Sequence, residues 1–342
     1  MERSGGIGYE GRMLRPSIPS AAKEPSPSGS SVDLRAEPES VTRFRRFVAG
    51  LRFDGLFWRR LAWAGSVYGP EWWKSYSPPF FAAAVFAVAH RNRRGATACQ
   101  ARVLGSEAGS ASARRAALRM FREFGFCMSE TMERFGPRPR PFRIDAPQPN
   151  PIGRALEAGL GAVLATAHVG NADVAARELR DTGRPVNLVM AREPNETTQD
   201  YVRDARASAD LRVILSDSSV FSAFNMIRAL RQNEILAIQI DRAGTGPFAP
   251  AGVREVPFFG SPARFLEGPF HLARLSGAPV IPVFTLRRGR RHYEIRVGEP
   301  RFVSRDDPDD TGRALDETVA LLETTIREHP EQWFQFSPPW SS

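Results

Sequence analysis

Apolar and polar positions follow two different patterns along this chain of 342 residues. In the second half, short apolar runs that end at a polar residue predict buried strands. These runs cover residues 161–168, 185–192, 235–241, 278–287 and 293–300. Segments with helical spacing lie between them, at residues 172–183, 224–234 and 270–277. Strands that alternate with helices predict βαβ units, and therefore a single α/β domain with a mostly parallel sheet flanked by helices.

The first half of the chain is patterned as helices. Residues 112–135 carry one apolar stripe at helical spacing, which core packing explains without any cofactor. Another helix is predicted over residues 311–328. Residues 1–40 are rich in Ser, Pro, Gly and Glu and have little apolar surface to bury, so we expect a disordered tail. A helical, membrane-associating part with a helical hairpin (41–140) and an α/β core (141–342) would follow.

Residues 41–64 interleave six arginines with aromatic side chains. One interpretation is a helix in a membrane interface, with its rings at the acyl boundary and its arginines at anionic head groups. The other is an ordinary amphipathic helix that packs on its own domain, and the pattern fits both. The longest apolar run, residues 80–89, has 10 residues and is too short to span a bilayer. We therefore expect a soluble or peripheral protein.

The charge balance narrows the choice of partners. The formal net charge is +9 and the isoelectric point is about 10.4, which suits anionic membranes, phosphorylated substrates or nucleic acid. No nucleic-acid-binding motif accompanies the arginines, so we do not expect a nucleic-acid partner. The two cysteines form no C-x-x-C pair, and a disulfide framework is not indicated.

One histidine stands where a strand is predicted to end, which is where open α/β sheets bind ligands. This residue is His168. The chain has no G-x-S-x-G, P-loop or dinucleotide-binding motif and no H-x-x-x-H pair for zinc. If Gly170 and Asn171 form a turn, Asp173 in the next helix would bind one ring nitrogen and leave the other as a general base. Alternatively, Asp173 complements the helix dipole and His168 is a core histidine.

Several further blocks of the chain resemble one family. AHVGNAD resembles the H-x4-D/E block of glycerolipid and lipid A acyltransferases. VMAREPN, ALRQNEILAIQIDRAG and the stretch from VREVPFFG to VIPVFTLRR are similar, in the same order, to blocks of the lipid A late acyltransferases (lauroyl and myristoyl transferases) and of relatives that acylate phosphatidylinositol mannosides. WAGSVYGPEWW and PEQWFQFSPPW resemble the terminal parts of that branch. The resemblance covers about residues 50–340, and the order of the blocks makes it specific where H-x4-D alone is weak.

The resemblance implies a role for each matching residue. His168 would deprotonate an acceptor hydroxyl that attacks an acyl thioester, without an acyl-enzyme, and Asp173 would orient His168. Asn171 would belong to the substrate-binding residues. Arg192 would bind a phosphate or shape the site. Asp241 would hold the site together or position the acceptor.

Three more arginines are candidates for contacts with anions. Arg242 would contact an anion, or is a solvated charge at a strand end. Arg264 and Arg254 flank the FFG sequence and would meet phosphopantetheine or lipid phosphate, or are ordinary surface charges. His271 is interpreted as structural.

The resemblance also implies the partners. The acyl donor would be acyl carrier protein or acyl-CoA, with no cofactor and no metal. The favoured acceptor is a lipid A precursor at an anionic membrane surface, with peripheral binding to the cytoplasmic face of the inner membrane. A phosphatidylinositol-mannoside-like glycolipid or a lysophospholipid is the alternative acceptor, and a hydrolytic or lipid-binding homologue is the alternative function. Asp173 replaces the Glu usual in lipid A enzymes, and residues 240–252 are rich in Gly and Pro, so both bear on the acceptor more than on the reaction.

Overall fold

The computed structural model describes residues 56–134, 136–137, 139–191, 211–216, 220–243 and 252–340, all of which belong to one compact unit, Gly50–Ser342. The predicted disordered tail and residues 41–55 of the predicted interfacial helix lie outside the described residues. Arg192 and most of the Gly- and Pro-rich stretch after Asp241 lie outside them as well.

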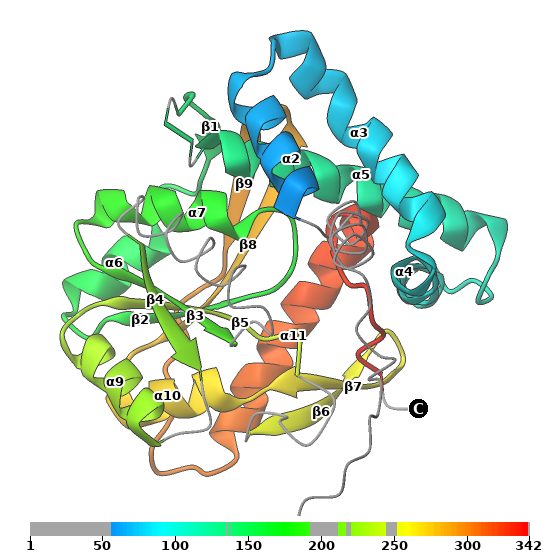
Figure 1. The fold of residues 1–342 in the computed structure, drawn as a ribbon. Coiled ribbons are helices and arrows are strands. Elements are labelled where there is room, and N and C mark those ends of the chain that lie inside the picture. The colour runs from blue at the N-terminus through cyan, green and yellow to red at the C-terminus, as the bar shows by residue number, and fades with distance from the viewer. Residues whose placement is uncertain are drawn as a thin grey trace, which may run out of the picture. The chain divides into compact units, whose positions relative to one another are not determined.

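The described N-terminal part is helical (Figure 1). Its helices are α2 (Leu56–Tyr68), α3 (Glu71–Val88), α4 (His90–Val103) and α5 (Ala111–Arg134). The bounds of α5 confirm the predicted long helix. Its buried apolar residues are Ala113, Ala116, Ala117, Met120, Phe121 and Cys127, whereas Met128 of the predicted stripe is 40% exposed. Helix α3 packs along α5, so closely that a Cβ added to Gly125 would lie 3.0 Å from the carbonyl oxygen of Pro78.

The main sheet of the described ranges has seven strands in the order β1-β9-β8-β2-β5-β3-β4. The strands are β1 (Arg143–Asp145), β2 (Ala162–Thr166), β3 (Val186–Ala191), β4 (Leu211–Ser216), β5 (Ile235–Gln239), β8 (Val280–Gly289) and β9 (His292–Val297). All neighbours are parallel except β8 and β9. The central strand β2 pairs with β5 on one side and β8 on the other.

The five predicted strands correspond to β2, β3, β5, β8 and β9, which confirms the α/β class. Strand β9 runs antiparallel to β8 because only Arg290 and Arg291 lie between the two strands. A two-residue connection joins antiparallel strands in a hairpin, whereas parallel strands need a much longer crossover. Arg291 has a φ of 54°, in the left-handed region that two-residue hairpins use. The sequence pattern missed β1, which has three residues, and β4, whose apolar run is too short to distinguish from a helix.

Side chains of the central strand point alternately to two helical layers. Val163 and Ala165 join the core formed with α9 (Val220–Arg231), α10 (Gly268–Ser276) and α11 (Asp310–Glu328). Ala162 and Leu164 join the core on the other face, with α6 (Pro151–Glu157) and α7 (Ala172–Glu178). The short 3₁₀ turns η1 (Leu179–Thr182) and η2 (Pro330–Gln332) follow α7 and α11. Burial on both faces explains why these strands read as continuous apolar runs.

The FFG sequence forms the tip of a separate hairpin of β6 (Val253–Phe258) and β7 (Ser261–Leu266). Phe259 and Gly260 occupy the two-residue turn with φ values of 48° and 75°, as a type I′ turn requires. Phe258 at its base contacts the rings of Trp333 and Trp340 from the C-terminal segment. The hairpin and the C-terminal segment thus form one aromatic cluster.

Within the described ranges, no helix combines the length and the apolar character needed to cross a membrane.

Candidate active site

The turn after β2 is shaped by Gly170. Its φ is 55°, and a Cβ at this position would lie 1.8 Å from the carbonyl oxygen of Thr285, so only glycine fits. The amide of Asn171 donates to the same oxygen at 3.3 Å. The turn therefore fixes His168 at the carboxyl edge of the sheet, as predicted from its position at a strand end.

His168 meets Asp241 at this edge. Thr166 of β2 pairs with Gln239 of β5, so the residues two positions beyond each strand come together. Nδ1 of His168 lies 2.8 Å from Oδ1 of Asp241. The amide of His168 lies 3.1 Å from each carboxylate oxygen. A carboxylate only accepts hydrogen bonds, so Nδ1 carries the proton and Nε2 is the basic nitrogen of the neutral ring.

The two members of this pair differ in exposure. The Asp241 side chain is 1% exposed, whereas that of His168 is 22% exposed. Burial by itself raises the pKa of Asp241, but the charge and hydrogen bonds of His168, together with the charge of Arg242, outweigh it and keep that pKa below its usual range. The site thus combines a buried, ionised carboxylate with an accessible imidazole.

The predicted hydrogen bond between Asp173 and the His168 ring is not found among the described residues. Asp173 does lie in the first turn of α7, as expected, and it lines the same cavity as His168. The ring instead bonds Asp241, because β2 and β5 are neighbours in the sheet. Asp241 thus takes the orienting position that we assigned to Asp173, and a catalytic part for Asp173 stays a prediction.

Asn171 is buried and bonds other parts of the protein. Its Nδ2 lies 2.8 Å from Oγ1 of Thr131, 3.0 Å from the carbonyl oxygen of Cys127 and 3.3 Å from the hydroxyl of Tyr293. These contacts tie the His168 turn to α5 and β9. Asn171 also lines the cavity, so contact with a substrate stays a prediction.

The predicted arginines have different positions. Arg242 lines the cavity, and its guanidinium donates to the carbonyl oxygen of Phe334 at 2.7 Å. Arg264 lies on β7 and is not among the residues that line the cavity. Arg254 pairs with Asp316 at 3.5 Å. The structure therefore brings only Arg242 of these three to His168, and Arg192 lies outside the described residues.

A cavity of about 370 Å³ opens beside His168. Its polar wall includes Thr131, Asp173, Gln239 and Arg242. Its apolar wall comes from β2, α7, β3, β5 and β8, and includes Leu164, Ala175, Ala176, Leu179, Leu188, Val189, Met190, Ala237 and Val283. Across the described ranges, no three or more His, Cys, Asp or Glu side chains gather as a metal site would require. The cavity can hold an apolar chain whose polar end reaches the imidazole.

Residues 60–342 match the model of the bacterial lipid A biosynthesis acyltransferase family. The chain belongs to this family. The finding confirms the resemblance seen in the sequence blocks around His168.

Curated relatives of this acyltransferase-family chain carry one name. Phosphatidylinositol mannoside acyltransferase from Mycobacterium tuberculosis (strain CDC 1551 / Oshkosh) is 31% identical over 190 residues, which cover 55% of this chain and 57% of the relative. The protein of the same name from Mycolicibacterium smegmatis (strain ATCC 700084 / mc(2)155) is 29% identical over 187 residues, 54% of this chain and 59% of the relative. The chain spans somewhat over half the length of these curated relatives.

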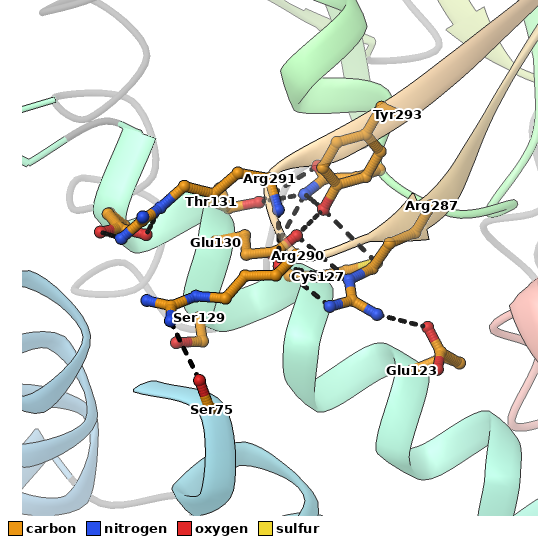
Figure 2. Close-up of polar contacts among 12 residues, drawn as sticks. Ser75, Glu123, Cys127, Ser129, Glu130, Thr131, Arg287, Arg290, Arg291 and Tyr293 are labelled. Carbon is orange, nitrogen blue, oxygen red and sulfur yellow. Dashed lines mark hydrogen bonds and ion pairs between the residues drawn. The ribbon is translucent and has the colours of Figure 1, made fainter. Parts of the chain in front are cut away.

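A second polar centre of this family member lies buried between α5 and the β8–β9 hairpin (Figure 2). We call Glu123, Glu130, Arg287 and Tyr293 the Glu130 network. The guanidinium of Arg287 lies 3.1 Å from Glu130 and 3.2 Å from Glu123, and the Tyr293 hydroxyl donates to Glu130. Burial lowers the pKa of Arg287, but the charge of Glu130 outweighs it and the pKa is raised. The network touches the His168 turn through Tyr293 and Asn171.

The network continues toward α3 by further ion pairs. Arg291 donates to Glu133 of α5 at 2.9 Å, and Lys74 of α3 lies 2.9 Å from the same carboxylate. Figure 2 also shows Arg290 donating to Ser75 of α3, at 3.0 Å. The turn of the β8–β9 hairpin thus contacts both α3 and α5 through polar side chains.

Sequence reasoning missed the residues that support the pair. Trp333 donates to Asp241, and Gln335 donates to the Asp241 carbonyl oxygen. Both belong to PEQWFQF, which we noticed as a family block without assigning a role to its side chains. The sequence did not single out Tyr293 and Glu130, because tyrosine is common in strands and glutamate is common in helices.

Proposed function

We propose that this protein is an O-acyltransferase that moves a fatty acyl chain from a thioester donor to a hydroxyl of a membrane glycolipid. The observation that carries the proposal is the His168–Asp241 pair beside a cavity that many apolar residues line. Membership of the acyltransferase family supports the same reaction.

The reaction follows from the protonation of the pair. Nε2 of His168 takes the proton of the acceptor hydroxyl as its oxygen attacks the thioester carbonyl. The carbon–sulfur bond then breaks, the ester forms, and the leaving thiolate receives the proton back from His168. Asp241 fixes the ring tautomer and stabilises the imidazolium between these two steps. The acyl group passes directly to the acceptor, so no covalent enzyme intermediate is part of the proposal.

Both substrates have a place beside this pair. The apolar wall of the cavity would receive the acyl chain, and burial of its methylene groups would supply binding energy of about 0.8 kcal/mol each. The donor is acyl carrier protein or acyl-CoA, whose phosphopantetheine arm carries an anionic phosphate. Arg242, which directly follows Asp241 in the sequence, lies on the polar wall of the cavity and suits an anionic group of either substrate.

The acceptor that we favour is a phosphatidylinositol-mannoside-like glycolipid, because the curated relatives carry that name. A lipid A precursor is the second candidate, since the family description names lipid A biosynthesis. Both are anionic glycolipids with free hydroxyls, so the same base and the same cavity would serve either.

We further propose that the protein binds peripherally to the cytoplasmic face of the inner membrane through α3. Trp72, Tyr76 and Phe80 recur every fourth residue on this helix and are 63%, 73% and 69% exposed. The opposite side of α3, with Lys74, packs on α5. Exposed aromatic rings on one helix side are typical of interfacial binding.

The reaction is tested by assaying the protein with labelled acyl-CoA and acyl-ACP against each glycolipid separately and against water alone. Wild type should add one acyl group to an acceptor. His168→Ala should lose roughly 10²- to 10⁴-fold of that rate, whereas His292→Ala, which removes the surface histidine bonded to Asp145, should keep it. Release of free fatty acid without an acylated lipid would establish a hydrolase instead. No turnover by folded wild type with any acceptor would refute the proposal.

Membrane binding is tested by co-sedimentation with anionic phospholipid vesicles. The variant Trp72→Ser/Tyr76→Ser/Phe80→Ser should move to the supernatant. The control Phe221→Ser/Phe224→Ser removes two exposed rings of α9 and should still sediment. Loss of sedimentation in the α9 variant and not in the α3 variant would refute α3 as the membrane-binding helix.

A further inference from the structure

The C-terminal segment, residues 332–336, runs across the His168 turn. The amide of Phe334 donates to the carbonyl oxygen of His168 at 2.7 Å, and the amide of Gly170 donates to that of Gln332 at 2.8 Å. Val169 and Trp333 therefore form an antiparallel bridge. This places the side chain of the one intervening residue, Trp333, beside the His168–Asp241 pair.

The indole of Trp333 completes the hydrogen bonding of Asp241. Its Nε1–H donates to Oδ2 at 3.1 Å, while Oδ1 accepts from the ring of His168 at 2.8 Å. The amide of His168 bridges both oxygens, and each oxygen then has one further donor of its own. Trp333 is 0% exposed and Asp241 1%, so the indole shields Oδ2 from solvent.

The direction of the indole N–H is fixed by packing. The Trp333 ring lies edge-on to Phe258 and Trp340, with centroids 5.6 and 6.0 Å away, and stacks on Phe259 at 6.5 Å. Such contacts lock the rotamer of a fully buried ring. A fixed donor on Oδ2 fixes the plane of the carboxylate, and the carboxylate in turn fixes the imidazole plane.

We propose that Trp333 is a positioning residue for the acyl transfer. It orients Asp241 and disperses its negative charge, so that Asp241 holds Nδ1–H of His168 without binding that proton too tightly. This role rests on the proposed function, because it acts through the base of that reaction.

The test compares two tryptophan-to-phenylalanine variants in the same aromatic cluster. Trp333→Phe removes the donor to Asp241. Trp340→Phe removes a donor to the carbonyl oxygen of Phe258, 2.8 Å away, with the same loss of ring volume. We expect Trp333→Phe to lower kcat by roughly 10- to 100-fold with little change in KM, the effect of one hydrogen bond to a charged group. Trp340→Phe should retain the wild-type kcat.

The pH dependence separates positioning from mere packing. Without the indole, the Asp241 carboxylate keeps more of its negative charge beside the His168 ring. It then stabilises the imidazolium more strongly, and the ring keeps its proton to higher pH. The acidic limb of kcat/KM should therefore move to higher pH in Trp333→Phe and stay in place in Trp340→Phe. Equal pH profiles and equal kcat in the two variants would overturn the inference.

A spectroscopic measurement keeps the inference testable if Trp333→Phe fails to fold or if wild type shows no transfer. In protein labelled with 5-fluorotryptophan, the fluorine resonance of Trp333 should titrate as His168 changes charge, and the titration should vanish in His168→Ala. The resonance of Trp340 should not titrate, and Trp340→Phe assigns it. A Trp333 resonance that ignores His168 would overturn the inference whatever the activity assay gives.

Discussion

Two buried polar centres lie side by side in this protein and differ in the nitrogen-bearing side chain that each carboxylate meets. At the candidate active site, Asp241 faces the imidazole of His168, which can gain and lose a proton. In the Glu130 network, Glu130 faces the guanidinium of Arg287, which is permanently charged. The first centre also opens to the cavity, whereas the Glu130 and Arg287 side chains of the second are only 6% and 9% exposed.

The difference separates the proposed reactive centre from a structural one. An imidazole changes charge near neutral pH and can pass a proton to a substrate. A guanidinium cannot, so its pairing with a buried carboxylate has only a structural effect. Asn171 links the two centres, since it belongs to the turn that follows His168 and its Nδ2 lies 3.3 Å from the Tyr293 hydroxyl. Stability of the turn should therefore depend on the second centre, and chemistry on the first.

Asp241→Asn should give the largest effect, on activity. The amide cannot stabilise the imidazolium, so kcat should fall by roughly 10²- to 10⁴-fold, measured by acyl transfer at saturating acceptor. Asp145→Asn is the matched control, because it alters the surface pair with His292 (2.6 Å). Equal activity in both variants would show that the Asp241 pair is not the reactive centre.

Glu130→Ala should give the largest loss of stability. It leaves Arg287 buried with Glu123 as its remaining carboxylate partner. Such a change costs about 3–5 kcal/mol in the free energy of unfolding. Glu294→Ala on β9 is the control: Glu294 pairs with two arginines, Arg288 and Arg296, but it is 31% exposed and its loss should cost about 0–1 kcal/mol. Urea unfolding measures both, and a smaller loss in Glu130→Ala than in Glu294→Ala would contradict the structural role.

Tyr293→Phe tests the contact between the centres. Loss of the buried hydroxyl removes a donor to Glu130 and a partner of Asn171, and should destabilise the protein by about 1–3 kcal/mol. Activity of the folded protein should fall by less than about tenfold, because the His168–Asp241 pair is intact. Tyr76→Phe, with an exposed hydroxyl, controls for the substitution. A loss as large as that of Asp241→Asn would make the Glu130 network part of the reactive centre.

Asp310 should give the smallest effect, visible only in acid. Hydrogen bonds from the Ser304 amide and then from Arg301 and Arg313 lower the pKa of Asp310 to about 2. The unfolded-state value is about 3.9, so the folded state gains stability above about pH 4 and loses it as the pH falls toward 2. The melting temperature measured at several pH values in this range should fall less steeply with decreasing pH for Asp310→Asn than for wild type. An unchanged slope would mean that Asp310 does not contribute.

Much of the fold was predictable because burial leaves a periodic pattern. The apolar runs at residues 161–168 and 235–241 mark β2 and β5, and the stripe over 112–135 marks α5. The β6–β7 hairpin was not predicted, since its alternation is broken by Pro257 and Pro262. The antiparallel direction of β9 depends on the two-residue turn between β8 and β9, and the spacing of apolar residues does not reveal the length of that turn.

The site was predictable only in part. His168, Arg242 and Asp173 reach one cavity, as the family blocks implied, whereas Arg264 does not. The carboxylate that bonds the His168 ring in the structure is Asp241, which the sequence did not single out because proximity along the chain favoured Asp173. Trp333 lies 92 residues from Asp241, and no local pattern connects them.

The sequence by itself determined the α/β class, the position of His168 at a strand end and the family. These are local properties, set by side-chain periodicity and by residues that follow one another in short blocks. The tertiary structure decided that β5 is the neighbour of β2, and hence that Asp241, 73 residues away, bonds His168. Strand order arises from the packing of the whole sheet between its helices, so only the folded chain specifies which carboxylate the histidine meets.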